Sequence, residues 1–463
     1  MRFPFLSIFL LIIITNQVFA QNYTGIWQGT ATGSNTIIQL KINIMYHTDT
    51  FVGAMLVEPE FEMLTDSTFA GSGIHLKSQK RPILLTGNIG EDLNLMTGEI
   101  CYGDKSYELE LRRGEKPLHR PQTPKKPYPY ISKDIIFRNE TDSINLGGIL
   151  ILPDSTGNFP AAILIGGSMP GDRNGEGYHH QSFLVIADFL TRNGIAVLRY
   201  DSRGVGKSEG NFFKSTAENT AKDVNAAILF LSQCKEINPG KIGVIGFSEG
   251  GLVAAIAAAQ IKHISFVVLM AGLAIDWKEN TRLQMELKLK HGDISKEGYD
   301  FFFKTEEIIH PLLLQNVYKQ TILDSLQVIQ DDFIKKIKKT EQPNIITNFA
   351  LQISNSMRLS NHYLFLYSCN PFEYISKIYC PVLSLNGTLD LNVPAKENQD
   401  AIRTALTKGG NENFKIIEME GLNHSFQECK TGTLKEAKEL EQTISPKALA
   451  IILQWLNEQE INN

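Results

Sequence analysis

The sequence predicts an α/β protein, in which a doubly wound, mostly parallel sheet carries a helical insertion and follows a small all-β domain. Three observations support this fold class. Residues after about 131 alternate short apolar runs with helical stretches. Residues 21–113 alternate apolar and polar residues with a period of two. A Gly-x-Ser-x-Gly motif stands where one of the later apolar runs gives way to a helix.

The first 20 residues have the pattern of a secretory signal peptide. Arg2 precedes an apolar stretch over residues 5–14, and Val18-Phe19-Ala20 resembles a cleavage site. The apolar stretch is too short to cross a bilayer, and no cysteine stands near the cleavage point. We therefore expect a secreted or periplasmic protein without a lipid anchor or another stable membrane anchor.

The composition limits the possible partners. The chain has 463 residues, 43% of them hydrophobic, which is enough for two or more domains with large cores. Its formal charge is -5, so basic residues are not in excess over acidic ones. We therefore expect no nucleic-acid partner. Five scattered cysteines leave room for one disulfide but not for a disulfide scaffold.

The segment after the signal predicts half-buried antiparallel strands. Residues 38–44 (IQLKINI) and 107–111 (YELEL) alternate strictly, so residues 21–113 are expected to form a small β-barrel or sandwich. Five prolines crowd into residues 114–130, which therefore predict a stiff linker.

Residues 131–463 predict the sheet with helices on both faces. Strands covered on both sides are apolar throughout, as in residues 161–165, 195–200, 242–245, 264–270 and 382–385. Helical stretches lie between them, including residues 183–191 and 221–231. Residues 278–365 are helical and charged without a clear strand, and predict a lid over the strand ends. Phe301, Phe302 and Phe303 are expected in the core of that lid.

Ser248 is the candidate nucleophile. It lies in Gly246-Phe247-Ser248-Glu249-Gly250, between a strand-like run and an alanine-rich helix, which is the pattern of a nucleophile elbow. A serine presented on such a tight turn needs small neighbours, and glycine alone allows so close a backbone approach.

Two downstream residues fit the partners that such a serine needs. Asp390 follows the apolar run 381–386, and His424 follows the strand-like run 414–419. A hydroxyl becomes a good nucleophile when a neutral imidazole takes its proton, and a carboxylate on the other ring nitrogen orients the imidazole. Ser248, Asp390 and His424 are therefore the predicted catalytic triad.

An oxyanion hole needs two backbone N–H donors. One is expected from Glu249, directly after the nucleophile. The other is expected from the loop at residues 166–171 (GGSMPG), where the N–H of Ser168 or Met169 is the candidate.

The remaining motifs do not indicate a catalytic or metal site. Residues 204–208 (GVGKS) look like the end of a phosphate-binding loop, but the first glycine of that motif falls on Asp201, so a turn is expected instead. The chain has no H-E-x-x-H and no paired C-x-x-C, so no metal site is indicated. Residues 335–339 (KKIKK) predict a solvated helix face, and His179-His180 a loop or helix start.

In combination these stretches resemble the α/β-hydrolase superfamily and, within it, secreted bacterial carboxylesterases of the serine aminopeptidase-like branch. The matching stretches are residues 199–208 (RYDSRGVGKS), 246–251 (GFSEGG), 380–387 (CPVLSLNG) with Asp390, 393–398 (VPAKEN) and 421–424 (GLNH). The resemblance covers residues 130–460. It implies serine hydrolysis of carboxylic esters without metal or cofactor, and its triad falls on Ser248, Asp390 and His424.

Three functions stay open from the sequence. The first is a carboxylesterase that acts on small-molecule esters. The second is a serine aminopeptidase-type peptidase, because the same triad can cleave an amide. The third is a non-catalytic ligand-binding protein on a hydrolase scaffold, against which the complete triad argues.

Overall fold

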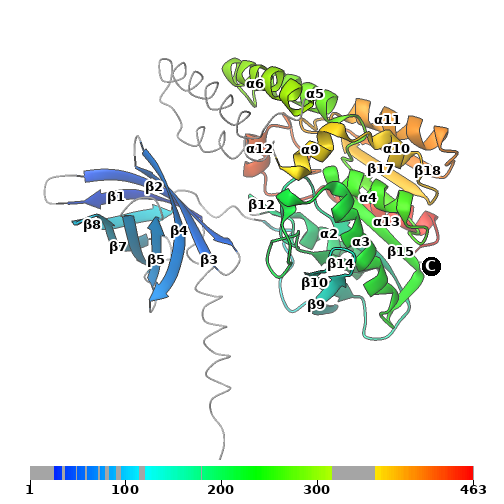
Figure 1. Ribbon diagram of the computed structural model, residues 1–463. Coiled ribbons are helices and arrows are strands. Elements are labelled where there is room, and N and C mark those ends of the chain that lie inside the picture. Colours follow the sequence, from blue (N-terminus) through cyan, green and yellow to red (C-terminus); the bar gives the residue numbers. More distant parts are fainter. Residues whose placement is uncertain are drawn as a thin grey trace, which may run out of the picture. The chain divides into compact units, whose positions relative to one another are not determined.

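We analysed a computed structural model of the protein, which describes residues 25–33, 37–47, 50–57, 60–70, 73–78, 83–89, 95–113, 120–178, 180–314 and 360–461 (Figure 1). The chain divides after Leu118 into an N-terminal unit and an α/β unit. Each unit is described by itself. The predicted signal peptide, residues 1–20, lies outside the described residues.

The N-terminal unit contains a closed barrel of antiparallel strands. These are β1 (Gly25–Thr32), β2 (Ile37–His47), β3 (Thr50–Val57), β4 (Glu60–Ala70), β5 (Gly73–Ser78), β6 (Ile83–Ile89), β7 (Leu95–Tyr102) and β8 (Lys105–Arg113). Strand β1 pairs with β8 and closes the barrel, with Trp27 opposite Arg113. Every second residue of β6 is buried, as the period of two predicts. The expected small all-β domain is thus confirmed, and it is a barrel rather than a sandwich.

One sheet organises the α/β unit. Its strands, in spatial order, are β18 (Phe414–Met419), β17 (Val382–Gly387), β16 (Val267–Met270), β15 (Ile237–Phe247), β11 (Phe159–Ile165), β14 (Ala196–Tyr200), β10 (Ile144–Leu152) and β9 (Ile131–Asn139). Neighbours from β18 to β14 run parallel, whereas β10 and β9 form an antiparallel edge. The mostly parallel sheet is confirmed.

Helices cover both faces of this sheet (Figure 1). One face carries α2 (Ser182–Arg192) and α13 (Pro446–Glu458), and the other carries α3 (Ala217–Ser232), α4 (Glu249–Gln260), α10 (Pro371–Ile375) and α11 (Ala395–Lys408). Two separate apolar cores result, because alternate residues of each strand point to opposite faces. The strands lie between these cores, which is why they are apolar throughout.

Helices follow β16 where the sequence predicts a lid. The described ones are α5 (Trp277–Lys290), α6 (Lys296–Leu314) and α9 (Asn361–Ser368), and no strand occurs among the described residues between β16 and β17. Residues 315–359, with the basic run 335–339, lie outside the described part. The short helix α12 (Leu434–Glu439) follows β18.

The second half of the predicted linker is attached to the α/β unit. The Arg120 guanidinium donates hydrogen bonds to the carbonyl oxygens of Tyr178 and Lys438, at 2.9 and 2.8 Å. The Gln122 amide donates to Ile444 O at 2.7 Å and accepts from Thr443 N at 2.6 Å. Hydrogen bonds therefore attach the segment 120–130 to the α/β unit, and it is not a free spacer.

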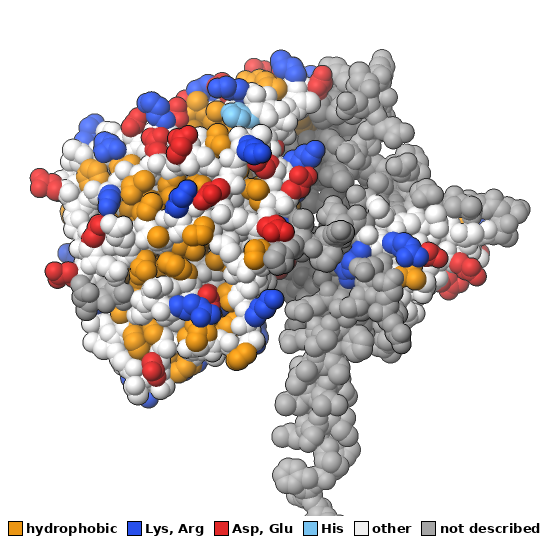
Figure 2. Space-filling view, turned by 180° about the vertical axis from the view of Figure 1, so that it is seen from behind, with side chains coloured by type: hydrophobic (Ala, Val, Ile, Leu, Met, Phe, Trp, Pro, Cys, Tyr) orange, Lys and Arg blue, Asp and Glu red, His pale blue; other side chains and the backbone are white. Residues whose placement is uncertain are grey.

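Acidic and basic side chains are interspersed on the face of the α/β unit that Figure 2 shows, without a large area of one sign. No helix of the described residues is long and apolar enough to cross a membrane. The five cysteines are unpaired thiols.

Candidate active site

Ser248 stands at a tight turn between β15 and α4. Its backbone adopts φ 58° and ψ -125°, a left-handed conformation that is rare outside glycine, and it is the residue directly before the helix. The Ser248 N–H donates to Met270 O at 2.8 Å, which ties the turn to the neighbouring strand. This geometry is that of the predicted elbow.

The glycines around Ser248 allow this turn. A Cβ at Gly246 would lie 2.1 Å from Gly250 O, and a Cβ at Gly250 would lie 2.4 Å from Gly166 O. Both distances fall far inside van der Waals contact, so any larger residue would force the backbone apart. The motif therefore has these glycines because β11, β15 and α4 approach one another closely here.

Asp390 lies in the loop after β17 with its side chain fully buried. Its Oδ1 accepts hydrogen bonds from the N–H groups of Asn392 and Val393, at 2.8 and 2.9 Å. Its Oδ2 faces Nδ1 of His424 at 2.8 Å. Both carboxylate oxygens are thus occupied, which fixes the orientation of this buried group.

His424 follows β18, at the same edge of the sheet. Its side chain is 17% exposed, and the bond to Asp390 occupies Nδ1, which leaves Nε2 available to a substrate or a nucleophile. The ring of Phe247, directly before Ser248, lies 4.9 Å from the imidazole between centroids. Asp390 and His424 are thereby joined, and His424 is placed beside the elbow.

The loop after β11 lies against Ser248. A Cβ at Gly167 would come within 3.3 Å of the Ser248 Cβ. The next two residues are Ser168, half-buried, and Met169, 52% exposed. Neither residue's N–H donates a hydrogen bond to another described residue, so both are available as donors beside the elbow, as is the first N–H of α4, from Glu249.

The loop after β14 holds this candidate oxyanion loop in place. Asp201 accepts hydrogen bonds from the Arg173 N–H and Nε, both at 2.9 Å. The Ser202 N–H donates to Gly171 O at 3.0 Å, and the Ser202 hydroxyl accepts from Gly171 N at 3.1 Å. The Ser208 hydroxyl donates to Asp201 O at 2.7 Å, so the end of the GVGKS run is part of a turn, as expected.

Glu249 has a second feature that sequence analysis missed. Its side chain is 3% exposed, and its carboxylate lies 2.9 Å from Nε2 of His362, which is 1% exposed and belongs to α9. Nδ1 of His362 is buried without a hydrogen-bond partner, so Nε2 is the nitrogen that donates to the carboxylate. This pair connects α9, at the C-terminal end of the insertion, to Glu249, the residue directly after the candidate nucleophile.

His180 is held by hydrogen bonds within the fold. It lies in the short strand β13 (His180–Gln181), which directly precedes α2, and its Nδ1 is 3.0 Å from the Thr443 hydroxyl. His179 lies outside the described residues. Within the described ranges, no group of three or more His, Cys, Asp or Glu side chains could hold a metal ion.

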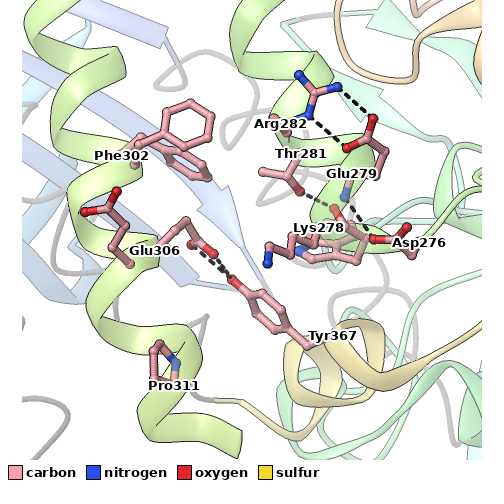
Figure 3. A pocket seen from close by; sticks show the side chains of 12 residues that line it. Asp276, Lys278, Glu279, Thr281, Arg282, Phe302, Glu306, Pro311 and Tyr367 are labelled. Atoms are coloured by element: carbon pink, nitrogen blue, oxygen red, sulfur yellow. Dashed lines mark hydrogen bonds and ion pairs between the residues drawn. The ribbon is translucent and has the colours of Figure 1, made fainter.

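A cavity of about 490 Å³ lies among α5, α6 and α9 (Figure 3). Phe302 and Phe303 line it, so these two rings border open space rather than only the core of the insertion. Glu306 and Tyr367 point toward one another, and the Tyr367 hydroxyl donates to the Glu306 carboxylate at 3.0 Å. No member of the predicted triad lines this cavity.

A smaller cavity of about 230 Å³ includes His424. It is lined by Lys288, Asp293, Leu391, Asn392, Asn423, His424, Ser425, Gly432, Leu434 and Ala437. We take this cavity, and not the larger one, as part of the candidate site, because it borders the imidazole that faces Asp390.

The sheet order, the elbow and the loops after β17 and β18 define the α/β-hydrolase fold. Comparison with known families agrees: residues 107–409 match the family X-Pro dipeptidyl-peptidase (S15 family). The chain belongs to this family. The matched range includes Ser248 and Asp390 and ends before His424.

The individual proteins that resemble this chain do so at low sequence identity or over short segments. Esterase EstD of Thermotoga maritima is 24% identical over 289 residues, which are 62% of this chain and 60% of that protein. Thiohydrolase aneE of Aspergillus aculeatus is 30% identical over 136 residues, 28% of this chain and 39% of its own length. The chain thus spans less than two thirds of either relative. An esterase structure from Pyrococcus furiosus aligns with 75% of this chain and 99% of its own, at 18% identity and a TM-score of 0.44.

Proposed function

We propose that this protein is a secreted or periplasmic serine esterase that cleaves carboxylic esters of small molecules through an acyl-enzyme. The observation that carries the proposal is the 2.8 Å hydrogen bond between buried Asp390 and His424. His424 lies beside the tight turn at Ser248, whose backbone has a positive φ. The signal-like residues 1–20 support secretion. The esterases among the relatives support an ester substrate.

In the proposed reaction, Ser248 Oγ attacks the ester carbonyl while Nε2 of His424 takes its proton. Asp390 holds the imidazole and stabilises its positive charge. The N–H of Glu249, with that of Ser168 or Met169, donates to the negative oxygen of the tetrahedral intermediate. His424 then protonates the departing alcohol, and water hydrolyses the acyl-enzyme by the same steps.

The family favours a second candidate, the cleavage of a peptide bond after an N-terminal X-Pro pair. The same triad serves both reactions, because they share the acyl-enzyme. Amide cleavage makes a greater demand on His424, since the amine must be protonated before it leaves.

A substrate panel separates the two candidates. We would measure kcat/KM for p-nitrophenyl esters of increasing acyl length beside X-Pro and aminoacyl p-nitroanilides. We expect turnover of the short esters and little of the anilides. Ser248→Ala should reduce kcat by roughly 10⁵- to 10⁶-fold, whereas Ser232→Ala, an exposed serine of α3, should not. A Ser248→Ala variant with a tenth of the wild-type rate would contradict the proposal.

A further inference from the structure

Helix α5 presents three polar side chains to the loop that holds Asp390. Asn280, Gln284 and Lys288 are spaced by four residues, so they lie along one side of the helix. Asn280 donates to Asn392 O and Gln284 donates to Asn392 Oδ1, both at 3.1 Å. Lys288 lies one turn further and lines the 230 Å³ cavity that includes His424.

Lys288 is a half-buried cation that lacks a partner. It forms no ion pair and no hydrogen bond with any other residue that the structure describes. Burial lowers the pKa of Lys288, and the nearby charges of Asp293 and Asp390 offset this effect only in part. Asp293 also lines this cavity and keeps its negative charge, but it accepts the Leu434 N–H at 2.8 Å and forms no ion pair with Lys288. Asp390 faces His424 instead.

The amide of Asn392 offers a second donor to the same cavity. Its Oδ1 accepts the hydrogen bond from Gln284, so its NH₂ group is left to donate. A half-buried ammonium and an amide from two residues that line the same cavity match the needs of a carboxylate, whose oxygens accept several hydrogen bonds.

The position of the cavity indicates which part of the substrate enters it. His424 delivers its proton to the leaving oxygen, so the alcohol portion of the ester must lie against the imidazole. Asn423, His424 and Ser425 all line the cavity, so it borders the residue that would protonate the leaving oxygen.

We propose that this cavity is the leaving-group subsite, and that Lys288 and Asn392 bind a carboxylate carried by the alcohol portion of the substrate. The inference rests on the proposed esterase function and names the class of ester. In the step concerned, the bond from Ser248 Oγ to the acyl carbon forms and the bond from that carbon to the alcohol oxygen breaks. The proton of Oγ passes through His424 to the leaving oxygen, and Lys288 transfers none.

Two acetate esters with matched leaving groups test the inference. The substrates are 4-acetoxybenzoate, with a charged leaving group, and methyl 4-acetoxybenzoate, its neutral counterpart. The measured quantity is the ratio of their kcat/KM values in wild type, Lys288→Met, Lys288→Arg and Lys290→Met. The intrinsic reactivities cancel because each ratio uses the same substrate pair.

We expect Lys288→Met to lower this ratio by about tenfold to a hundredfold, the effect of losing a hydrogen bond between charged groups. Lys288→Arg should retain much of the preference. Lys290→Met, an exposed lysine on the same helix, should keep the wild-type ratio. In wild type, 4-hydroxybenzoate should inhibit competitively and more strongly than its methyl ester, and added salt should weaken this difference.

An unchanged ratio in Lys288→Met, or equal losses with both substrates, would overturn the inference, as would stronger inhibition by the methyl ester. The inhibition experiment uses wild type alone, so it decides the matter even if the variant fails to fold. Failure of the esterase proposal looks different. Wild type would then hydrolyse neither acetate, or Ser248→Ala would hydrolyse both.

Discussion

At the scale of single residues, the two oxygens of Asp390 have separate tasks. Oδ1 holds the loop through the N–H groups of Asn392 and Val393, and Oδ2 holds His424. An asparagine can keep the first set of bonds but replaces the second acceptor with a donor. The residue therefore allows orientation of the imidazole to be tested apart from folding.

We expect Asp390→Asn to lower kcat by about 10⁴-fold, because the amide favours the wrong tautomer of His424. Circular dichroism and the melting temperature should change little. Asp400→Asn is the control, since Asp400 forms an exposed ion pair with Lys396. Wild-type activity in Asp390→Asn would assign the acid to another residue.

The pair of Glu249 and His362 is the other buried ionisable contact at this site. His362→Ala leaves the Glu249 carboxylate buried without the imidazole. We expect a loss of about 3–5 kcal/mol in the free energy of unfolding, as found when one partner of a buried pair is removed. Urea unfolding of His362→Ala, Glu249→Ala and the double variant measures this.

In that cycle, the double variant should lose less than the sum of the two single variants, because the charge and its partner disappear together. Fully additive losses, or a loss below about 1 kcal/mol in His362→Ala, would show that the contact is only one of packing. The kcat of His362→Ala reports separately whether the pair positions the Glu249 N–H.

At the scale of elements, helix α5 both supports the loop that holds Asp390 and carries Lys288, which has no ion-pair partner among the described residues. Asn280 and Gln284 bond to the Asp390 loop, while Lys288 is desolvated. Desolvation lowers the folded-state pKa of Lys288 below the value of 10.5 that an unfolded chain would show. Between these two values the unfolded chain binds more protons, so stability rises with pH across that window.

Lys288→Met should therefore raise the melting temperature at pH 7, where the buried charge opposes folding. The gain should shrink as the pH rises and should vanish above 10.5, where the lysine is neutral in both states. Lys290→Met should show neither effect, since that side chain is exposed. A lower melting temperature in Lys288→Met at pH 7 would indicate that the ammonium stabilises the fold.

At the scale of the whole molecule, every proposed catalytic group belongs to the α/β unit. We expect a protein without residues 21–118 to fold and to hydrolyse short esters at nearly the wild-type rate. The cut after Leu118 keeps Arg120 and Gln122, which bond to the α/β unit. Removal of residues 21–129 is the comparison, and it should lower the melting temperature.

Both truncations are to be assayed on the shortest p-nitrophenyl ester with circular dichroism alongside. A folded but inactive protein lacking residues 21–118 would mean that the barrel completes the active site. Deletion of residues 278–365 removes most of α5, all of α6 and His362 of α9. It should alter which esters are accepted and should also lower the melting temperature.

Local pattern alone was enough for much of the fold. The strand-like run 414–419 is β18 with the same bounds, and the period of two marked the barrel. The helix expected at residues 221–231 begins earlier, at Ala217, because Thr216 and Asn219 form a capping box. The antiparallel edge of β9 and β10 was not predicted, since an apolar run does not reveal the direction of its neighbour.

The sequence by itself determined the fold class and the order of Ser248, Asp390 and His424, because strand periodicity and a glycine-flanked serine are local signals. Only the tertiary structure joined Asp390 to His424, paired Glu249 with His362, and placed Lys288 in a cavity beside His424. These contacts depend on how distant segments pack, and a polar residue on a solvated helix face looks the same in sequence as one aimed at a catalytic site.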